Sequence, residues 1–120
     1  MKKIEGMGIA LITPFKSDYS VDYEALERLV EFQVSAGADF LAILATTAET
    51  PTLTLEERAK VRKLVTEVVR GRVPIVIGCG GNNTLAICEE LKNGDWTGID
   101  AILSVVPYYN KPSQEGLYQH

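Results

Sequence analysis

The sequence has few of the residues that build metal, redox or nucleotide sites. It contains one histidine, His120, and two cysteines, Cys79 and Cys88, which do not form a CxxC pair. Neither a GxGxxG fingerprint nor a GxxxxGK[ST] loop occurs, so the usual motifs of dinucleotide and P-loop binding are missing. No group of His, Cys and carboxylate residues has the spacing of metal ligands. The sequence therefore predicts neither a metal nor a cofactor.

Positive charge and long apolar runs are also scarce. Twelve Lys and Arg residues face sixteen Asp and Glu residues, for a net charge of -4, which leaves no basic footprint for nucleic acid or an anionic membrane. No apolar run approaches the roughly 20 residues that span a bilayer, and no apolar segment of signal-peptide length follows residues 1–6. We expect no nucleic-acid partner, no membrane association, and a cytoplasmic protein with reduced thiols.

What is present is the composition of one globular domain. Of the 120 residues, 46% are hydrophobic and 23% are charged, which is typical of soluble proteins and fits a single domain over residues 1–120. Four apolar runs lack polar alternation, and each predicts a strand buried on both faces, as in parallel sheets. These runs are Met7–Phe15, Phe40–Ala45, Val73–Gly78 and Ala101–Val106.

Segments of helical periodicity separate the strands. Thr54 and Glu57 have the spacing of a capping box at the start of one of them. The helices are expected from Asp22 to Gly37, from Thr54 to Gly71, from Asn83 or Thr84 to Gly94, and, as the first turn of a fourth, from Ser113 to Tyr118. This order predicts an α/β fold with helices outside a parallel sheet. An open doubly wound sheet and an eight-stranded barrel both use it.

Polar residues follow the second predicted strand, where parallel α/β folds collect their chemistry. Thr46 and Thr47 offer two adjacent hydroxyls and two backbone N–H groups, a suitable cradle for a carboxylate. The alternative is a threonine-rich turn whose hydroxyls bond its own backbone.

The ends of the third and fourth strands are also candidates. The glycine loop over residues 78–81 admits a ligand close to the backbone or only turns the chain. Tyr108 and Tyr109 supply phenols for proton transfer or for an interface. Cys79 has no neighbouring histidine in the sequence, which argues against a nucleophile.

Three segments resemble one enzyme family. They are Gly8–Phe15, Ala45–Leu53 and Val106–His120, and they are similar to the dihydrodipicolinate synthase and N-acetylneuraminate lyase family of pyruvate-dependent class I aldolases. The resemblance implies a (β/α)8 barrel, of which this chain corresponds to the N-terminal (βα)4 half of a TIM barrel. It also implies pyruvate bound to a lysine as a Schiff base and condensed with aspartate semialdehyde in lysine biosynthesis.

The resemblance implies roles for particular residues. Thr46 and Thr47 correspond to the threonines that hold the carboxylate of pyruvate or a similar keto acid, and Thr46 also relays protons to a tyrosine. Tyr109 corresponds to the tyrosine that completes this relay in a neighbouring subunit, which implies a homo-oligomer. The Thr-Thr pair and the run Tyr-Tyr-Asn-Lys-Pro over residues 108–112 favour the synthase branch over the lyase branch.

Two departures from the family pattern bear on the site. Ala45 and Ala48 replace the two glycines of the usual Gly-Thr-Thr-Gly-Glu loop. If either position needs a positive φ, alanine strains the turn and disturbs the carboxylate site. Leu55 and Ala86 stand where lysine-inhibited members carry histidine and glutamate, so feedback inhibition by lysine is not expected.

The Schiff-base lysine of the family lies on strand 6, beyond these 120 residues. No lysine falls within a predicted strand, where desolvation lowers the pKa of an amine; the lysines are Lys2, Lys3, Lys16, Lys60, Lys63, Lys92 and Lys111. We expect the isolated chain to be inactive. Three hypotheses remain: part of a complete synthase, a free-standing natural or engineered half-barrel that dimerises, and a keto-acid-binding module.

Overall fold

The computed structural model describes residues 3–120, and Lys2 lies outside the described residues. Four parallel strands form one sheet in the order β1-β2-β3-β4. The strands are β1 (Gly8–Ala10), β2 (Phe40–Ile43), β3 (Ile75–Gly78) and β4 (Ala101–Leu103). In a doubly wound sheet the order of the strands across the sheet reverses at an inner strand. Here the strands follow one another in chain order, which favours a barrel segment.

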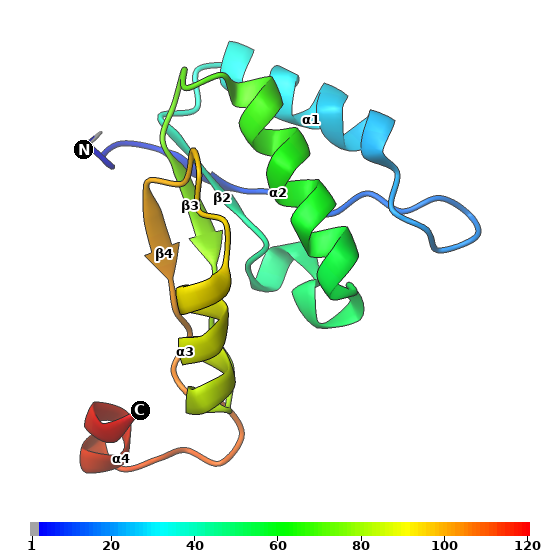
Figure 1. Ribbon diagram of the computed structural model, residues 1–120. Helices are drawn as coiled ribbons and strands as arrows, with labels where there is room; N and C mark the ends of the chain where they lie inside the picture. The colour runs from blue at the N-terminus through cyan, green and yellow to red at the C-terminus, as the bar shows by residue number, and fades with distance from the viewer. Residues whose placement is uncertain (1–2) are drawn as a thin grey trace.

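Helices alternate with the strands as predicted (Figure 1). They are α1 (Tyr23–Ser35), α2 (Leu55–Val69), α3 (Thr84–Asn93) and α4 (Gln114–Gln119). Two 3-10 turns, η1 (Thr46–Ala48) and η2 (Thr50–Thr52), join β2 to α2. The four strands are shorter than the apolar runs that predicted them.

Side-chain caps start the helices at the predicted positions. The Asp22 carboxylate accepts from the Ala25 N–H at 2.9 Å, and the Asn83 side chain accepts from the Ala86 N–H at 3.1 Å. Helix α2 ends earlier than the expected Gly71. Its last residue is Val69, and Arg70 already adopts the left-handed conformation. The chain therefore leaves this helix before it reaches Gly71.

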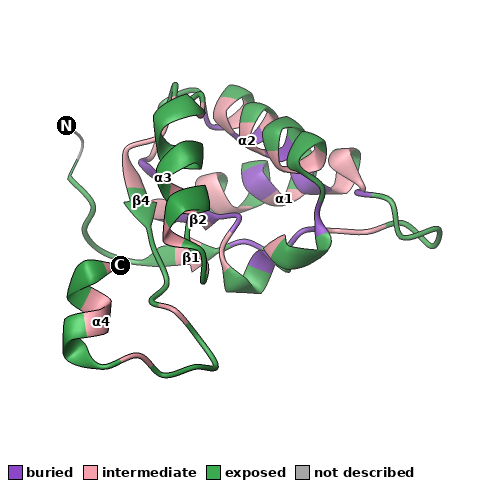
Figure 2. Cartoon of the chain, turned by 60° about the horizontal axis from the view of Figure 1, so that its bottom comes forward, coloured by how far each residue is buried: buried purple, intermediate pink, exposed green. Residues whose placement is uncertain are grey.

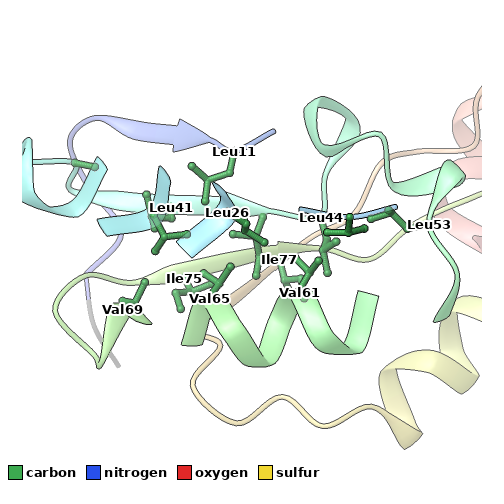
Figure 3. Packing of buried hydrophobic residues seen from close by; sticks show 14 residues of the cluster. Leu11, Leu26, Leu41, Leu44, Leu53, Val61, Val65, Val69, Ile75 and Ile77 are labelled. Carbon is green, nitrogen blue, oxygen red and sulfur yellow. The ribbon is translucent and has the colours of Figure 1, made fainter. Parts of the chain in front are cut away.

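The core lies between one face of the sheet and helices α1 and α2 (Figures 1 and 3). Strands β2 and β3 contribute Leu41, Ile43, Ile75 and Ile77, none more than 2% exposed. The helices pack Leu26, Val30, Val61, Val65 and Val69 against them. Burial of this apolar set, roughly 25 cal/mol per Å² removed from water, is what holds the sheet to the helices.

The other face of the sheet is open in the part of the chain that the structure describes. Only β3 is buried along most of its length, whereas β1 and β4 keep exposed residues (Figure 2). Ile12, just after β1, is 54% exposed and Leu103 is 52% exposed. The expectation of strands buried on both faces is therefore wrong for β1 and β4, since α1 and α2 cover one face only.

Two aspartates fix the strand register at the edge of the sheet where the strands begin. Asp39 accepts from the Met7 N–H at 2.7 Å, and its own N–H donates to the Met7 carbonyl at 3.0 Å. Asp100 repeats the arrangement with Ile75, at 3.0 and 2.9 Å. These pairs anchor one end of the sheet and leave its opposite end to the loops that carry the candidate site.

Candidate functional site

The Thr46–Thr47 pair lies on η1, directly after β2. Both residues are exposed, and η1 is closed by hydrogen bonds from the Ala48 N–H to the Ala45 carbonyl and from the Glu49 N–H to the Thr46 carbonyl. Within residues 3–120, the hydroxyls and backbone N–H groups of Thr46 and Thr47 have no hydrogen-bond partner. Four donors of two adjacent residues are thus left for a ligand or for solvent.

The neighbouring threonines do what the alternative interpretation assigned to Thr46 and Thr47. The Thr13 hydroxyl, which is buried, donates to the Ala48 carbonyl at 2.8 Å. The Thr50 hydroxyl donates to the Ala45 carbonyl at 2.9 Å, and the Thr52 hydroxyl donates to the Glu49 carbonyl at 2.8 Å. These three bonds stabilise the turn and keep the Thr46–Thr47 pair free for another role.

Alanine at positions 45 and 48 causes no strain in this turn. Ala45 has φ -98°, and Ala48 is not among the residues with positive φ. The left-handed conformations fall instead on Leu44, at φ 49°, and Glu49, at φ 54°. The concern that either alanine disturbs the site by backbone strain is therefore wrong.

The end of β3 passes close under this turn. A Cβ added at Gly78 would collide with the Leu44 carbonyl oxygen and lie 2.8 Å from the Cα of Ala45. Glycine is required at this position because two backbone segments of the chain meet, which is neither the ligand approach nor the sharp turn expected for the glycine loop.

A cavity of about 730 Å³ opens beside the turn. Thr46, Thr50 and Tyr108 are among its lining residues, together with Arg58 from α2. The Arg58 guanidinium donates to the Thr50 carbonyl at 3.0 Å, and its buried Nε has no partner within the described residues. This side chain ties the start of α2 to the loop that carries the threonines.

The chain does not bring Tyr109 to Thr46. Tyr108 lines the cavity and is 53% exposed, whereas Tyr109 is 93% exposed and is not among the lining residues. Tyr109 has φ 70°. Asn82, from the loop after β3, contacts the backbone of Tyr108 with both atoms of its side-chain amide.

Other candidate groups are unsuited to nucleophilic chemistry. Burial, followed by the nearby Glu90 carboxylate, raises the pKa of the Cys79 thiol to about 11, so the thiol is protonated at neutral pH. Among the described residues no lysine lies in a strand, and Lys111 is exposed in the loop after β4. Residues 3–120 hold no group of three or more His, Cys, Asp or Glu side chains arranged for a metal ion.

The described helices include none that is long and apolar enough to cross a membrane.

Comparison with known proteins matches residues 3–120 to the model of the dihydrodipicolinate synthetase family. The chain belongs to this family. Among relatives of the dihydrodipicolinate synthetase family, the 4-hydroxy-tetrahydrodipicolinate synthase of Parabacteroides distasonis is 65% identical over 117 residues, covering 98% of this chain and 39% of that protein. The synthase of Phocaeicola vulgatus is 62% identical over 118 residues, covering 98% and 40%.

Solved structures of dihydrodipicolinate synthases share the fold. The Acinetobacter baumannii enzyme, described as chloride-inhibited and complexed with pyruvate, has a TM-score of 0.92 at 43% identity and covers 98% of this chain and 40% of that one. The predicted α/β fold, a portion of a TIM barrel, is thereby confirmed. The chain spans about 40% of the length of the curated relatives that it matches.

The structure adds three residues that the sequence analysis did not single out as functional. Thr13 and Arg58 bond backbone carbonyls of the threonine loop, and Asn82 holds Tyr108. Each partner lies at least eight positions away in the chain. Thr13 and Asn82 each had a visible signal, since both are polar residues that follow a predicted strand, whereas Arg58 offered none.

Proposed function

We propose that this chain is the N-terminal part of a 4-hydroxy-tetrahydrodipicolinate synthase that condenses pyruvate with aspartate semialdehyde. The observation that carries the proposal is the free set of donors on Thr46 and Thr47 at the strand ends. Membership of the dihydrodipicolinate synthetase family, over residues 3–120, supports it.

In this proposal the carboxylate of pyruvate accepts hydrogen bonds from the N–H groups and hydroxyls of Thr46 and Thr47. Hydrogen bonds to an ionised acceptor are shorter and stronger than neutral ones, so the pair binds and orients the keto acid. The Thr46 hydroxyl then passes protons between the pyruvate-derived enamine and Tyr109 of a second copy. The 93% exposure of Tyr109 supports its use outside its own chain.

The amine that forms the Schiff base, with loss of water from the pyruvate carbonyl, lies outside these 120 residues. The isolated chain is therefore expected to show no synthase activity above background, because the covalent route is missing. A coupled reductase assay checks this. Turnover that is lost when Lys111 is replaced would contradict the expectation and make Lys111 the nucleophile.

We also propose a cytoplasmic location for the protein. Both cysteines, Cys79 and Cys88, are free, which fits that location.

Complementation tests the role of the threonine pair. The chain is mixed with the C-terminal part of the Parabacteroides distasonis synthase, and pyruvate is trapped with borohydride, which reduces a lysine Schiff base to a stable adduct. We expect an adduct and turnover, and we expect Thr46→Val to lower kcat by about 10²-fold, as for general acid–base groups.

The matched control for this experiment is Thr97→Val. Thr97 precedes β4, at the end of the sheet where the strands begin and opposite the threonine loop. This variant is therefore expected to keep the activity of the unaltered complex. A Thr46→Val complex of normal kcat would show that the relay assignment is wrong.

A keto-acid-binding module without turnover is the second candidate, favoured by the presence of all four donors on this chain. Calorimetric titration of the isolated chain with pyruvate detects it. Heat of binding that falls in Thr46→Val, with no borohydride adduct after complementation, supports the module over the synthase.

A further inference from the structure

The side chain of Asn82 pairs with the backbone of one distant residue. Its Oδ1 accepts from the Tyr108 N–H at 2.8 Å, and its Nδ2 donates to the Tyr108 carbonyl at 3.2 Å. An amide that bonds both backbone groups of one residue acts as a strand backbone does in a sheet. It continues the β3–β4 pairing, whose last backbone bond joins the Cys79 N–H to the Leu103 carbonyl at 3.1 Å.

The residue after this anchor has a rare conformation. The Tyr108 carbonyl also accepts from the Asn110 N–H at 3.0 Å, and Tyr109, between them, has φ 70°. A bond from residue i to i+2 around a positive φ is a γ-turn, which is strained for a non-glycine residue. Lys111 also has a positive φ, 46°. Such strain persists only where surrounding contacts hold the backbone in place.

We propose that Asn82 is a positioning residue that holds the Tyr109 turn in the geometry the proton relay needs. The inference rests on the proposed function for the role of Tyr109. Tyr109 is 93% exposed, so its own side chain gains little support from this chain. Its placement depends on the backbone, and the Asn82 amide fixes that backbone at Tyr108. The same two loops also approach each other at Gly80, where an added Cβ would lie 2.7 Å from the Val105 nitrogen.

Amide hydrogen exchange, resolved by residue, tests the anchor without any activity. Asn82→Ala removes both bonds, and exchange of the Tyr108 N–H is expected to speed up by about tenfold or more. The control is Asn93→Ala at the end of α3, an exposed residue whose side chain has no hydrogen bond within residues 3–120. Unchanged exchange at Tyr108 in Asn82→Ala overturns the proposal.

Asn82→Asp supplies a rescue that a purely space-filling role would not show. At neutral pH the carboxylate keeps an acceptor for the Tyr108 N–H but places a negative oxygen beside the Tyr108 carbonyl. Below roughly pH 3.9 the protonated carboxyl donates again. Exchange at Tyr108, relative to the unaltered chain at the same pH, is expected to be fast at neutral pH and to return toward normal in acid. Equal exchange at both pH values overturns the paired-amide role.

Kinetics of the complemented enzyme test the consequence for Tyr109. Asn82→Ala is expected to lower kcat by about tenfold or more, since small displacements of reacting groups are costly. The KM for pyruvate should stay within about twofold, because the Thr46–Thr47 turn belongs to another loop. A raised KM with normal kcat overturns the proposal. Absence of a borohydride adduct in the unaltered complex instead contradicts the proposed function, and the exchange results still decide the anchor.

Discussion

At the scale of single residues, the ion pair between Glu31 and Arg72 makes the free energy of unfolding depend on pH in the acidic range. The Arg72 guanidinium donates to both carboxylate oxygens of Glu31, at 2.9 and 2.6 Å. Hydrogen bonds from Arg72 and then from Ser35 lower the pKa of Glu31 from 4.5 to about 2. Because the pKa of Glu31 is lower in the folded chain, the ion pair stabilises the fold at pH values above about 4.5. This contribution is lost as the pH falls from about 4.5 to about 2.

We therefore expect Glu31→Gln to lower the free energy of unfolding at pH 7 and to match the unaltered chain near pH 2. Urea unfolding at both pH values, at low salt, measures the difference. Both side chains are partly exposed, so added salt should reduce the effect at pH 7. The control is Glu27→Gln on the same helix. A Glu31→Gln penalty that is constant with pH would contradict the assigned ion pair.

Local contacts are the part of the fold that the sequence predicted well. Asp22 and Thr54 were recognised as caps because a cap and its partner are close in the chain. Each of these side chains accepts from a backbone N–H three positions further on. Thr46 and Thr47 were singled out because they are adjacent in the chain, and their role stays a prediction. Arg58 and Asn82 were not, because their partners are placed by the fold and not by the local sequence.

At the scale of elements, the start of α2 determines where the threonine loop ends. The Thr54 hydroxyl accepts from the Glu57 N–H at 3.2 Å, and the Glu57 carboxylate accepts from the Thr54 N–H at 2.8 Å. Thr54→Ala is expected to lower the free energy of unfolding by about 1 kcal/mol. Thr54→Ser keeps the oxygen and should cost less. Thermal or urea unfolding checks both, and equal losses would show that the hydroxyl is not the cause.

The helix α3 shows where periodicity alone predicts too little. This helix carries Ile87, Cys88 and Leu91 at helical spacing, yet no residue of α3 is buried and Leu91 is 39% exposed. In contrast, α1 buries Leu26 and Val30, and α2 buries Val61, Val65 and Val69. A period shows which side of a helix is apolar, but the depth of burial depends on what packs against it.

At the scale of the whole molecule, the open face of the sheet predicts self-association of the isolated chain. Ile12 and Leu103 are about half exposed, and β1 and β4 are the edge strands of the sheet within residues 3–120, so each has one side without a neighbouring strand. A two-fold axis along the barrel direction would place β4 of one copy beside β1 of the other, parallel to it, and cover both. We expect a dimer or a larger assembly at micromolar concentration.

Light scattering measures this association. Leu103→Lys should weaken it, whereas Tyr19→Lys should not, because Tyr19 lies in the loop between β1 and α1, away from the open face. A well-folded monomer of the unaltered chain at micromolar concentration would contradict the prediction.

The order of the strands in the sheet has a consequence for how the chain folds during its synthesis. Each strand pairs with the strand that was made just before it, as Leu41 with Ile75 and Ile77 with Ile102 show. Among the described strands each pairing spans one helical crossover and waits for no later strand, so the entropic cost of loop closure is similar at every step. The four strands can therefore pair one after another as the ribosome releases the chain, each on the edge formed by the strand before it.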